Sequence, residues 1–290
     1  MKELVIISGK GGTGKTSVTA SFAALAERPV IADCDVDAAD LHLVLGPEIR
    51  QCNDFYSGRE AVINPQDCID CGVCLEPCRF GAVIEVDKAT HDAAFAIEPI
   101  ACEGCGVCVW LCPTKAIAFS ERLCGQWMVS STRYGPMVHA QLGVAAENSG
   151  KLVTVVREMA RLLAEQERRK LIIIDGPPGI GCAAIASMTG ASLALAVTEP
   201  TVSGEHDLER ILSLARHFGI PSAVCVNKWD LNSAMTERIE HKARQAGARI
   251  VGRIRYDRAV SHAQMQERAV VEIDAACAAD IRQIWRQLDL

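Results

Sequence analysis

The stretch Gly9-Lys10-Gly11-Gly12-Thr13-Gly14-Lys15-Thr16 decides how the rest of the chain is organised. It follows the apolar run 4–7 and precedes the helix-forming residues 17–20, so it lies where a strand passes into a helix. Its letters match G-x-x-x-x-G-K-[ST], a loop whose backbone N–H groups surround phosphate oxygens at the positive end of a helix dipole. The pattern predicts that residues Gly9 to Ser17 bind a nucleotide, with Lys15 at the β- and γ-phosphates and Thr16 as a ligand of Mg²⁺.

Length, charge and cysteine content restrict the class of protein. The 290 residues, 49% of them hydrophobic, suffice for one large α/β domain or two smaller units. A net charge of -6 gives no general attraction to nucleic acid or anionic lipid. The first strand follows Met1-Lys2-Glu3 with no room for a signal peptide, so we expect a cytoplasmic protein. In that reducing compartment fourteen cysteines favour metal binding over disulfides.

Short apolar runs predict the fold. Five of them, at 4–7, 30–32, 171–174, 193–197 and 223–226, are separated by helix-length segments, as in a parallel sheet buried on both faces. Helices are predicted over 15–27, 152–167, 205–218 and 233–246. The repeated order implies right-handed crossovers. We therefore expect an α/β fold with an open, doubly wound, mostly parallel sheet, whose ligands bind at the carboxyl ends of the strands.

Carboxylates follow two of these runs. Asp33 and Asp35 end the second run, and Asp175 ends the run at 171–174, just before Gly176-Pro177-Pro178-Gly179. An aspartate at the position of Asp175 is the usual second anchor of Mg²⁺, held through water. Asp37 is expected to cap a helix that begins near residue 38.

Taken together, KGGTGKT, the D-x-D at Asp33 and Asp35, and DGPPG at Asp175 resemble the deviant phosphate loop and the two switches of one ATPase family. That family contains MinD, Mrp-type iron–sulfur carriers and the nitrogenase iron protein. The resemblance implies a nucleotide-dependent homodimer, or a related heterodimer, in which Lys10 reaches the partner's phosphates; a solvated loop lysine is the alternative. It also implies a hydrolase that is slow without a partner, in which Asp35 activates the attacking water and Asp33 supports it.

The segment Asn227-Lys228-Trp229-Asp230 follows the fifth run and is placed for base recognition. The resemblance favours ATP, with Asn227 touching adenine. The same letters fit N-K-x-D, the guanine-reading motif in which Asp230 would pair with the base, so GTP remains an alternative.

Between residues 58 and 120 two four-cysteine runs repeat at a distance of 34 positions. This internal duplication resembles a bacterial two-cluster ferredoxin inserted whole into the nucleotide domain. In such arrays the fourth cysteine of each run ligates the other cluster. One 4Fe-4S cluster is therefore expected on Cys68, Cys71, Cys74 and Cys112, and the other on Cys102, Cys105, Cys108 and Cys78. Zinc rarely uses three cysteines as closely spaced as Cys68, Cys71 and Cys74, so a zinc site is a weak alternative.

The predicted domains are a first nucleotide-binding segment at 1–57, the α+β ferredoxin-like insert at 58–121, and a second nucleotide-binding segment at 122–290. Residues 125–150 are expected to form an ordered loop region. Cys182 follows Asp175 at the spacing where the nitrogenase iron protein keeps a ligand of its bridging cluster. A buried or capping cysteine is favoured there, although Cys124 is a conceivable second ligand. An apolar stripe with balanced charges in the last ten residues predicts packing on the core and no membrane anchor.

Two classes of function remain open. In the first, nucleotide state gates electron transfer from the clusters to a partner redox protein. In the second, the protein is a carrier or assembly factor for iron–sulfur or other metal centres. A positioning ATPase like MinD is a weaker third class, because MinD has a basic membrane helix and this chain lacks one.

Overall fold

A computed structural model describes residues 1–143 and 148–290, and its described part forms two compact units. The first unit comprises Met1–Asn53, Gln126–Leu142 and Asn148–Leu290. The second comprises Asp54–Gly125 together with residue 143. Two long strands, β3 and β6, contribute residues to both units.

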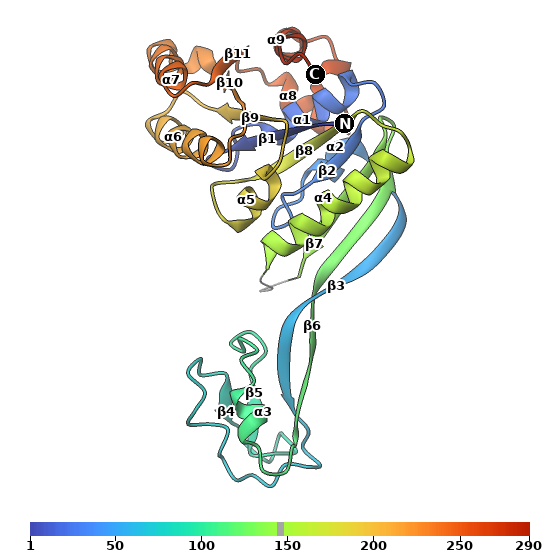
Figure 1. Cartoon of the computed structure of the whole chain (residues 1–290), viewed down its shortest axis with the longest axis vertical. Helices are drawn as coiled ribbons and strands as arrows, with labels where there is room; N and C mark the ends of the chain where they lie inside the picture. The colour runs from blue at the N-terminus through green and yellow to red at the C-terminus, as the bar shows by residue number, and fades with distance from the viewer. Residues whose placement is uncertain (144–147) are drawn as a thin grey trace. The chain divides into compact units, whose positions relative to one another are not determined.

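The first unit is built on a sheet whose strands follow the order β11-β10-β9-β1-β8-β2-β7-β6-β3 (Figure 1). The strand pairs from β11 across to β7 are all parallel, with central registers such as Leu4 opposite Ile173 and Ile31 opposite Ile173. The strands are β1 Lys2–Ser8, β2 Val30–Asp33, β3 Glu48–Ile63, β6 Ile117–Ser131, β7 Pro136–Leu142, β8 Leu171–Pro178, β9 Leu193–Thr198, β10 Ser222–Asn227 and β11 Arg249–Ile254. The predicted α/β fold with a mostly parallel sheet is confirmed.

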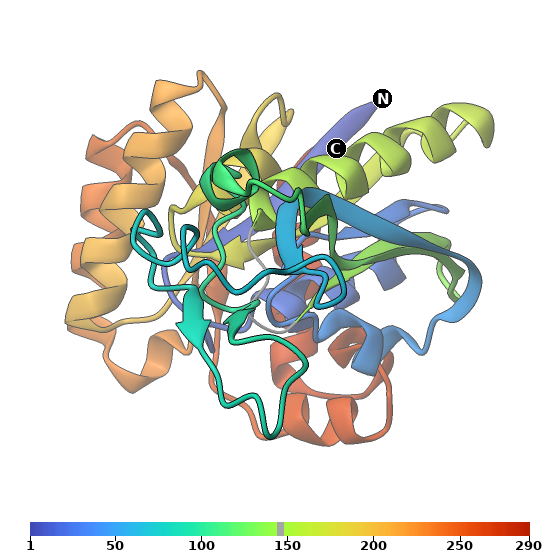
Figure 2. The ribbon, with the colours of Figure 1, turned by 90° about the horizontal axis from the view of Figure 1, so that it is seen from below.

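Helices cover both faces of this sheet (Figures 1 and 2). One face carries α4 Ser149–Gln166, α5 Cys182–Met188, α6 Val202–His217 and α7 Ser233–Gln245. The other carries α1 Lys15–Leu25, α2 Leu41–Leu45, α8 Ala259–Met265 and α9 Ala276–Gln287, with the short helical turn η2 Val270–Glu272. A further turn, η1 Trp229–Leu231, follows β10.

The core explains why the apolar runs became strands. Their residues are almost wholly buried, because the sheet is covered on both sides. The stripe predicted near the C-terminus packs there too: Ile281 and Ile284 are at most 2% exposed, and the Trp285 ring lies 5.0 Å from the Phe22 ring. Among the described residues, no helix is both long enough and apolar enough to cross a membrane.

Two expectations were wrong. The segment 125–150 is not a loop region, because it contains the end of β6 and all of β7, joined by a turn in which Thr132 donates to the carbonyl of Gly135; residues 144–147 lie outside the described part. Asp37 caps no helix, because α2 begins only at Leu41 and has Asp40 at its N-cap position. Between these points the chain turns before it becomes helical.

The second unit contains the strands β4 Val83–Glu85 and β5 Phe95–Ile97, which pair antiparallel, and the helix α3 Val107–Leu111. Its backbone repeats at the same interval of 34 residues as its cysteines. Left-handed φ values recur at Asp70 and Gly104, at Gly72 and Gly106, and at Gly81 and Lys115. The unit therefore duplicates its conformation as well as its sequence.

The two cysteine runs of this unit, with the residues around them, form two halves that are joined by a pair of equivalent backbone hydrogen bonds. Glu98 N donates to Ala82 O at 2.7 Å, and Asn64 N donates to Ala116 O at 2.7 Å. Each donor and each acceptor is displaced by 34 positions from its counterpart. The halves are thus related by an approximate internal symmetry.

Candidate nucleotide site and cysteine array

The phosphate loop connects β1 to α1, and two of its glycines are required by their surroundings. Gly14 has a φ of 91°, and a Cβ there would lie 2.4 Å from the side-chain amide nitrogen of Asn227. A Cβ on Gly9 would lie 2.1 Å from Cβ of Asp207. Both contacts are closer than real Cβ atoms allow, so a side chain on Gly14 would push the Asn227 amide away and one on Gly9 would press against the backbone of α6 at Asp207.

Lys15 and the first pair of carboxylates lie together at the carboxyl edge of the sheet. Lys15 Nζ is 3.5 Å from Asp35 Oδ2, and both residues are buried. Asp35 N donates to Asp33 Oδ1 at 3.1 Å, whereas Asp33 Oδ2 is buried without a partner. Burial raises the pKa of Asp35 to about 6, although the Lys15 ammonium opposes the shift. Burial and the Asp175 carboxylate raise the pKa of Asp33 well above its ordinary value.

Asp175 is bound by two hydroxyl groups of α1. Thr16 Oγ1 donates to Asp175 Oδ2 at 2.9 Å, and Thr19 Oγ1 donates to Asp175 Oδ1 at 2.7 Å. Burial raises the pKa of Asp175, against the opposing effects of Lys15 and these two hydroxyls. The Thr16 hydroxyl, the Asp175 carboxylate and the unpartnered oxygen of Asp33 are donors of the kind that Mg²⁺ prefers, so the residues present fit this ion.

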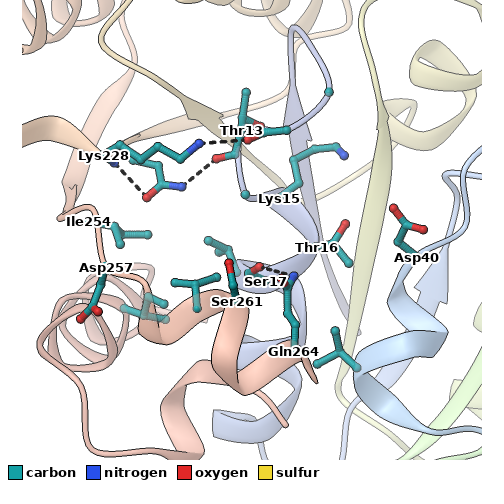
Figure 3. A pocket seen from close by; sticks show the side chains of 18 of the residues that line it. Thr13, Lys15, Thr16, Ser17, Asp40, Lys228, Ile254, Asp257, Ser261 and Gln264 are labelled. Atoms are coloured by element: carbon teal, nitrogen blue, oxygen red, sulfur yellow. Dashed lines mark hydrogen bonds between the residues drawn. The ribbon is translucent and has the colours of Figure 1, made fainter. Parts of the chain in front are cut away.

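A cavity of about 860 Å³ opens beside the loop (Figure 3). Its floor is formed by Gly11–Val18 with Asp35, and the opposite wall by the segment Ile254–Arg258 and by α8. Asn227 Nδ2 donates to Thr13 O at 2.8 Å, and Gln264 Nε2 donates to Ser17 Oγ at 3.1 Å. The first bond ties the end of β10 to the phosphate loop, and the second ties α8 to the start of α1. The cavity has the size and the polar floor expected of a nucleotide site.

Five of the predicted residues are absent from this lining: Gly9, Lys10, Asp33, Asp175 and Asp230. Lys10 Nζ is 3.3 Å from Glu199 Oε2 and 3.5 Å from Ser203 Oγ, so its ammonium is bound within its own chain. Asp230 Oδ1 accepts a hydrogen bond from Tyr256 N at 2.7 Å and is not among the lining residues. Asn227 does line the cavity, so the structure separates the two proposed base-reading side chains.

In the second unit, one small cavity brings together the four cysteines assigned to the first cluster. Cys68, Cys71, Cys74 and Cys112 all line it, together with apolar residues such as Phe95. Burial raises the pKa of Cys74, and the other three thiols raise it further. Burial likewise raises the pKa of Cys108, with Cys102, Cys105 and Cys74 adding to the shift.

Backbone amides surround the fourth cysteine of each run. Burial opposes ionisation of Cys78, but the amides of residues 80–83 lower its pKa below the usual value. For Cys112, Ala116 N donates to Sγ at 3.3 Å, and this amide with the Thr114 hydroxyl outweighs burial and lowers the pKa. N–H···S bonds of this kind suit a thiolate ligand. Within residues 1–143 and 148–290, no three His, Cys, Asp or Glu side chains are grouped as around a single bound ion.

The remaining cysteines and the histidine of β7 have different surroundings. The expectation of a buried or capping cysteine at Cys182 was wrong, because the thiol is exposed and the N-cap position of α5 is Gly181, with Cys182 the first helical residue. The Cys124 thiol is buried and donates to Ser57 O at 3.1 Å. Burial lowers the pKa of His139 to about 4, and its Nε2 lies 2.8 Å from Ser130 Oγ, so His139 is a neutral structural side chain.

Sequence reasoning missed three features of the site. Thr19 stands one turn after Thr16, where a helix places a second hydroxyl on the same face. Glu199 directly follows the buried strand β9, the same signal that identified Asp33 and Asp175. The wall at Ile254–Arg258 starts at the last residue of β11, whose two arginines, Arg249 and Arg253, obscure its strand character.

Comparisons with known proteins agree with this geometry. The model of the CobQ/CobB/MinD/ParA nucleotide binding domain matches residues 4–270. Uncharacterized protein MJ0578 of Methanocaldococcus jannaschii is 34% identical over 234 residues, covering 80% of this chain and 79% of that protein. The septum site-determining protein MinD of Bacillus subtilis is 24% identical over 216 residues, covering 73% of this chain and 58% of that protein.

Among solved structures, MinD of Pyrococcus horikoshii complexed with Mg-ADP superposes with a TM-score of 0.59, at 16% identity, over 99% of this chain and 96% of that one. This likeness concerns the fold. None of the four descriptions mentions an iron–sulfur cluster.

Proposed function

Because the chain belongs to the CobQ/CobB/MinD/ParA nucleotide-binding family, we propose that it hydrolyses ATP as a dimer and carries two 4Fe-4S clusters whose electrons pass to a partner protein. The nucleotide state would then control when the clusters deliver those electrons. The proposal has a nucleotide half and a cluster half, and each half has its own support.

The nucleotide half rests on the arrangement of Lys15, Thr16, Asp35 and Asp175 around the loop. Lys15 would meet the phosphates, Thr16 and Asp175 would hold Mg²⁺ in place, and Asp35 would orient the attacking water with support from Asp33. Mg²⁺ supplies neutralisation of the charge that develops on the phosphates. ATP is favoured over GTP because Asp230, which would have to read guanine, already accepts the Tyr256 amide and lies outside the cavity lining.

The cluster half is carried by one observation, the repeat at 34 residues in sequence, backbone φ and hydrogen bonds. It supports a two-cluster ferredoxin insert, because such a unit needs two equivalent loops that exchange their fourth ligands. The cavity lined by Cys68, Cys71, Cys74 and Cys112 supports the same pairing. Bound clusters would supply one-electron redox chemistry.

Iron analysis of protein isolated without oxygen tests the cluster half. We expect about eight iron atoms per chain, since two four-iron clusters need them. Changing Cys112→Ser should remove close to half of the iron, and changing Cys52→Ser, an exposed cysteine outside the array, should remove none. Bound zinc without visible charge-transfer absorption would contradict the proposal.

A positioning ATPase like MinD is a second candidate, because named relatives and structural neighbours are MinD proteins. In that case ATP-dependent dimerisation and partner binding should survive loss of the clusters. A carrier of iron–sulfur or metal centres would instead pass labelled iron to an acceptor when ATP is added. A variant with Cys68→Ser and Cys102→Ser should bind ATP in all three cases. It should lose electron transfer if the clusters deliver electrons, keep ATP-dependent dimerisation and partner binding if the protein is a positioning ATPase, and lose transfer of iron if it is a carrier.

A further inference from the structure

One carboxylate holds two lysines beside the phosphate loop. Glu199 Oε2 lies 3.3 Å from Lys10 Nζ, and Glu199 Oε1 forms a second ion pair with Lys228 Nζ. The Glu199 side chain is 13% exposed, so this interaction is better shielded from water than an ordinary surface pair. Lys228 Nζ also donates to Gly12 O at 3.3 Å. Glu199 thereby connects the beginning of the loop, its middle and the end of β10.

The backbone places Glu199 firmly at this point. It follows the buried strand β9 and precedes Thr201, whose hydroxyl caps α6 by accepting from Gly204 N at 3.0 Å. Ser203, on the first turn of α6, supplies the other contact to Lys10 at 3.5 Å. Lys10 is therefore held against the start of α6 by a charged and a neutral partner from the same short segment.

An ammonium paired in this way is not free to reach another molecule. A lysine that acts on the phosphates of a second chain must first leave its partners in its own chain, and the ion pair is lost when it does. The separated Glu199 keeps Lys228 as a partner, which lowers the electrostatic penalty of releasing Lys10.

We propose that Glu199 is a positioning residue that restrains Lys10 within its own chain and so limits nucleotide-dependent dimerisation. The inference rests on the proposed function, in which Lys10 acts on the partner's phosphates. In each chain the Lys10–Glu199 ion pair must break as the dimer forms, while Glu199 keeps its pair with Lys228.

The test is the dissociation constant of the dimer formed with a non-hydrolysable ATP analogue, measured by sedimentation. Changing Glu199→Gln keeps the shape of the side chain and removes its charge. A partly exposed ion pair changes an equilibrium constant by at most roughly fivefold. Because one Lys10–Glu199 pair breaks in each of the two chains, the dissociation constant of the dimer should fall by up to ~25-fold. Glu209→Gln removes the same charge from α6 at a pair with Lys242 and should leave the constant unchanged.

Two further variants separate this role from a structural one. In a Lys228→Met background the effect of Glu199→Gln should persist; if it disappears, Glu199 acts only through Lys228 and the inference is wrong. Equal or weaker dimerisation of Glu199→Gln with normal nucleotide affinity also overturns it. Lys10→Ala tests the underlying function separately: if that variant dimerises as the wild type does, the role of Lys10 on the partner fails, whereas loss of dimerisation with an unchanged Glu199→Gln variant rejects the restraint alone.

Discussion

The two lysines of the phosphate loop differ in their surroundings, and this difference predicts different losses. Lys15 is 6% exposed and faces Asp35 across the site, whereas the Lys10 side chain is 34% exposed and bound outside the cavity lining. Lys15→Ala should therefore weaken nucleotide binding itself. Lys10→Ala should leave binding measurable but lose ATP-dependent dimerisation and most hydrolysis.

Nucleotide affinity by calorimetry and dimer size by light scattering check these two losses on the same samples. A Lys10 variant that dimerises normally with ATP would show that the lysine does not act on the partner. Arg28→Ala, at an exposed positive residue after α1, is a suitable control for the change in charge.

The raised pKa of Asp35 means that its ionised carboxylate, proposed to be needed for hydrolysis, destabilises the folded protein. Its pKa rises from 3.8 to about 6 in the folded protein, so the folded state holds the proton more tightly than the unfolded chain. Stability therefore falls as the pH rises through this interval, and above pH 6 the buried charge costs about 2 to 3 kcal/mol. In protein free of nucleotide and Mg²⁺, Asp35→Asn should raise the unfolding free energy by about that amount at pH 7.5 while abolishing hydrolysis.

Denaturant unfolding at pH 7.5 and at pH 5 measures the effect, which should be clearly smaller at the lower pH. The exposed neighbour Asp37→Asn provides a control with the same change of charge. Destabilisation by Asp35→Asn at pH 7.5 would mean that the Lys15 pair outweighs burial.

Among the elements, those with uninterrupted aliphatic runs were predictable and those formed by long-range pairing were not. β1, β8 and β9 were evident because strands buried on both faces contain few polar residues. β7 was missed because its run Pro136–Leu142 includes His139, whose burial depends on Ser130 of the neighbouring strand. The cavity wall at Ile254–Arg258 likewise becomes visible only when the fold brings it opposite the loop.

Ion pairs between Glu3 of β1 and two arginines of α4 hold these elements together. Glu3 is buried and forms ion pairs with Arg157 and Arg161 of α4, and these pairs, against the effect of burial, lower its pKa. Their contribution is present above pH 4.5 and is lost as the pH falls through the lowered pKa. Glu3→Gln leaves the buried Arg157 without its charge partner and should cost about 3 to 5 kcal/mol.

Arg161→Ala is the matched comparison, because the Arg161 side chain is 38% exposed and water can replace its partner. Its cost should be no more than about 1 kcal/mol. Equal losses in the two variants, measured by denaturant unfolding, would contradict the view that Arg157 carries the penalty.

At the scale of the whole molecule, the two units differ in charge. Residues 54–125, the main part of the second unit, contain eleven acidic and five basic residues, so this segment accounts for the net charge of -6 of the whole chain. If the second unit carries the proposed clusters, reduction of one would add a further negative charge to this acidic surrounding, and the acidic residues would lower its reduction potential. A process that changed the electrostatic surroundings of the proposed clusters would therefore shift their reduction potential.

The chain itself offers a connection between the nucleotide site and the second unit. In the first unit, Leu142 N donates to Val36 O at 3.2 Å, beside Asp35; in the second, the next residue, Gly143, donates to Cys124 O at 2.8 Å. A shift of the segment after β2 on loss of the γ-phosphate would act on residue 142 and so on its covalent neighbour. We expect nucleotide state and cluster potential to be coupled.

Coupling must be reciprocal, so a nucleotide that shifts the potential must bind the oxidised and reduced proteins with different affinity. A typical coupling of ~1 to 3 kcal/mol corresponds to roughly 40 to 130 mV for one electron, since a tenfold change in equilibrium is 59 mV. Anaerobic redox titration followed by EPR, without nucleotide, with ADP and with a non-hydrolysable ATP analogue, measures it. Three superimposable curves would reject gating by nucleotide, and would favour a carrier, in which ATP controls release of cargo and leaves the potential unchanged.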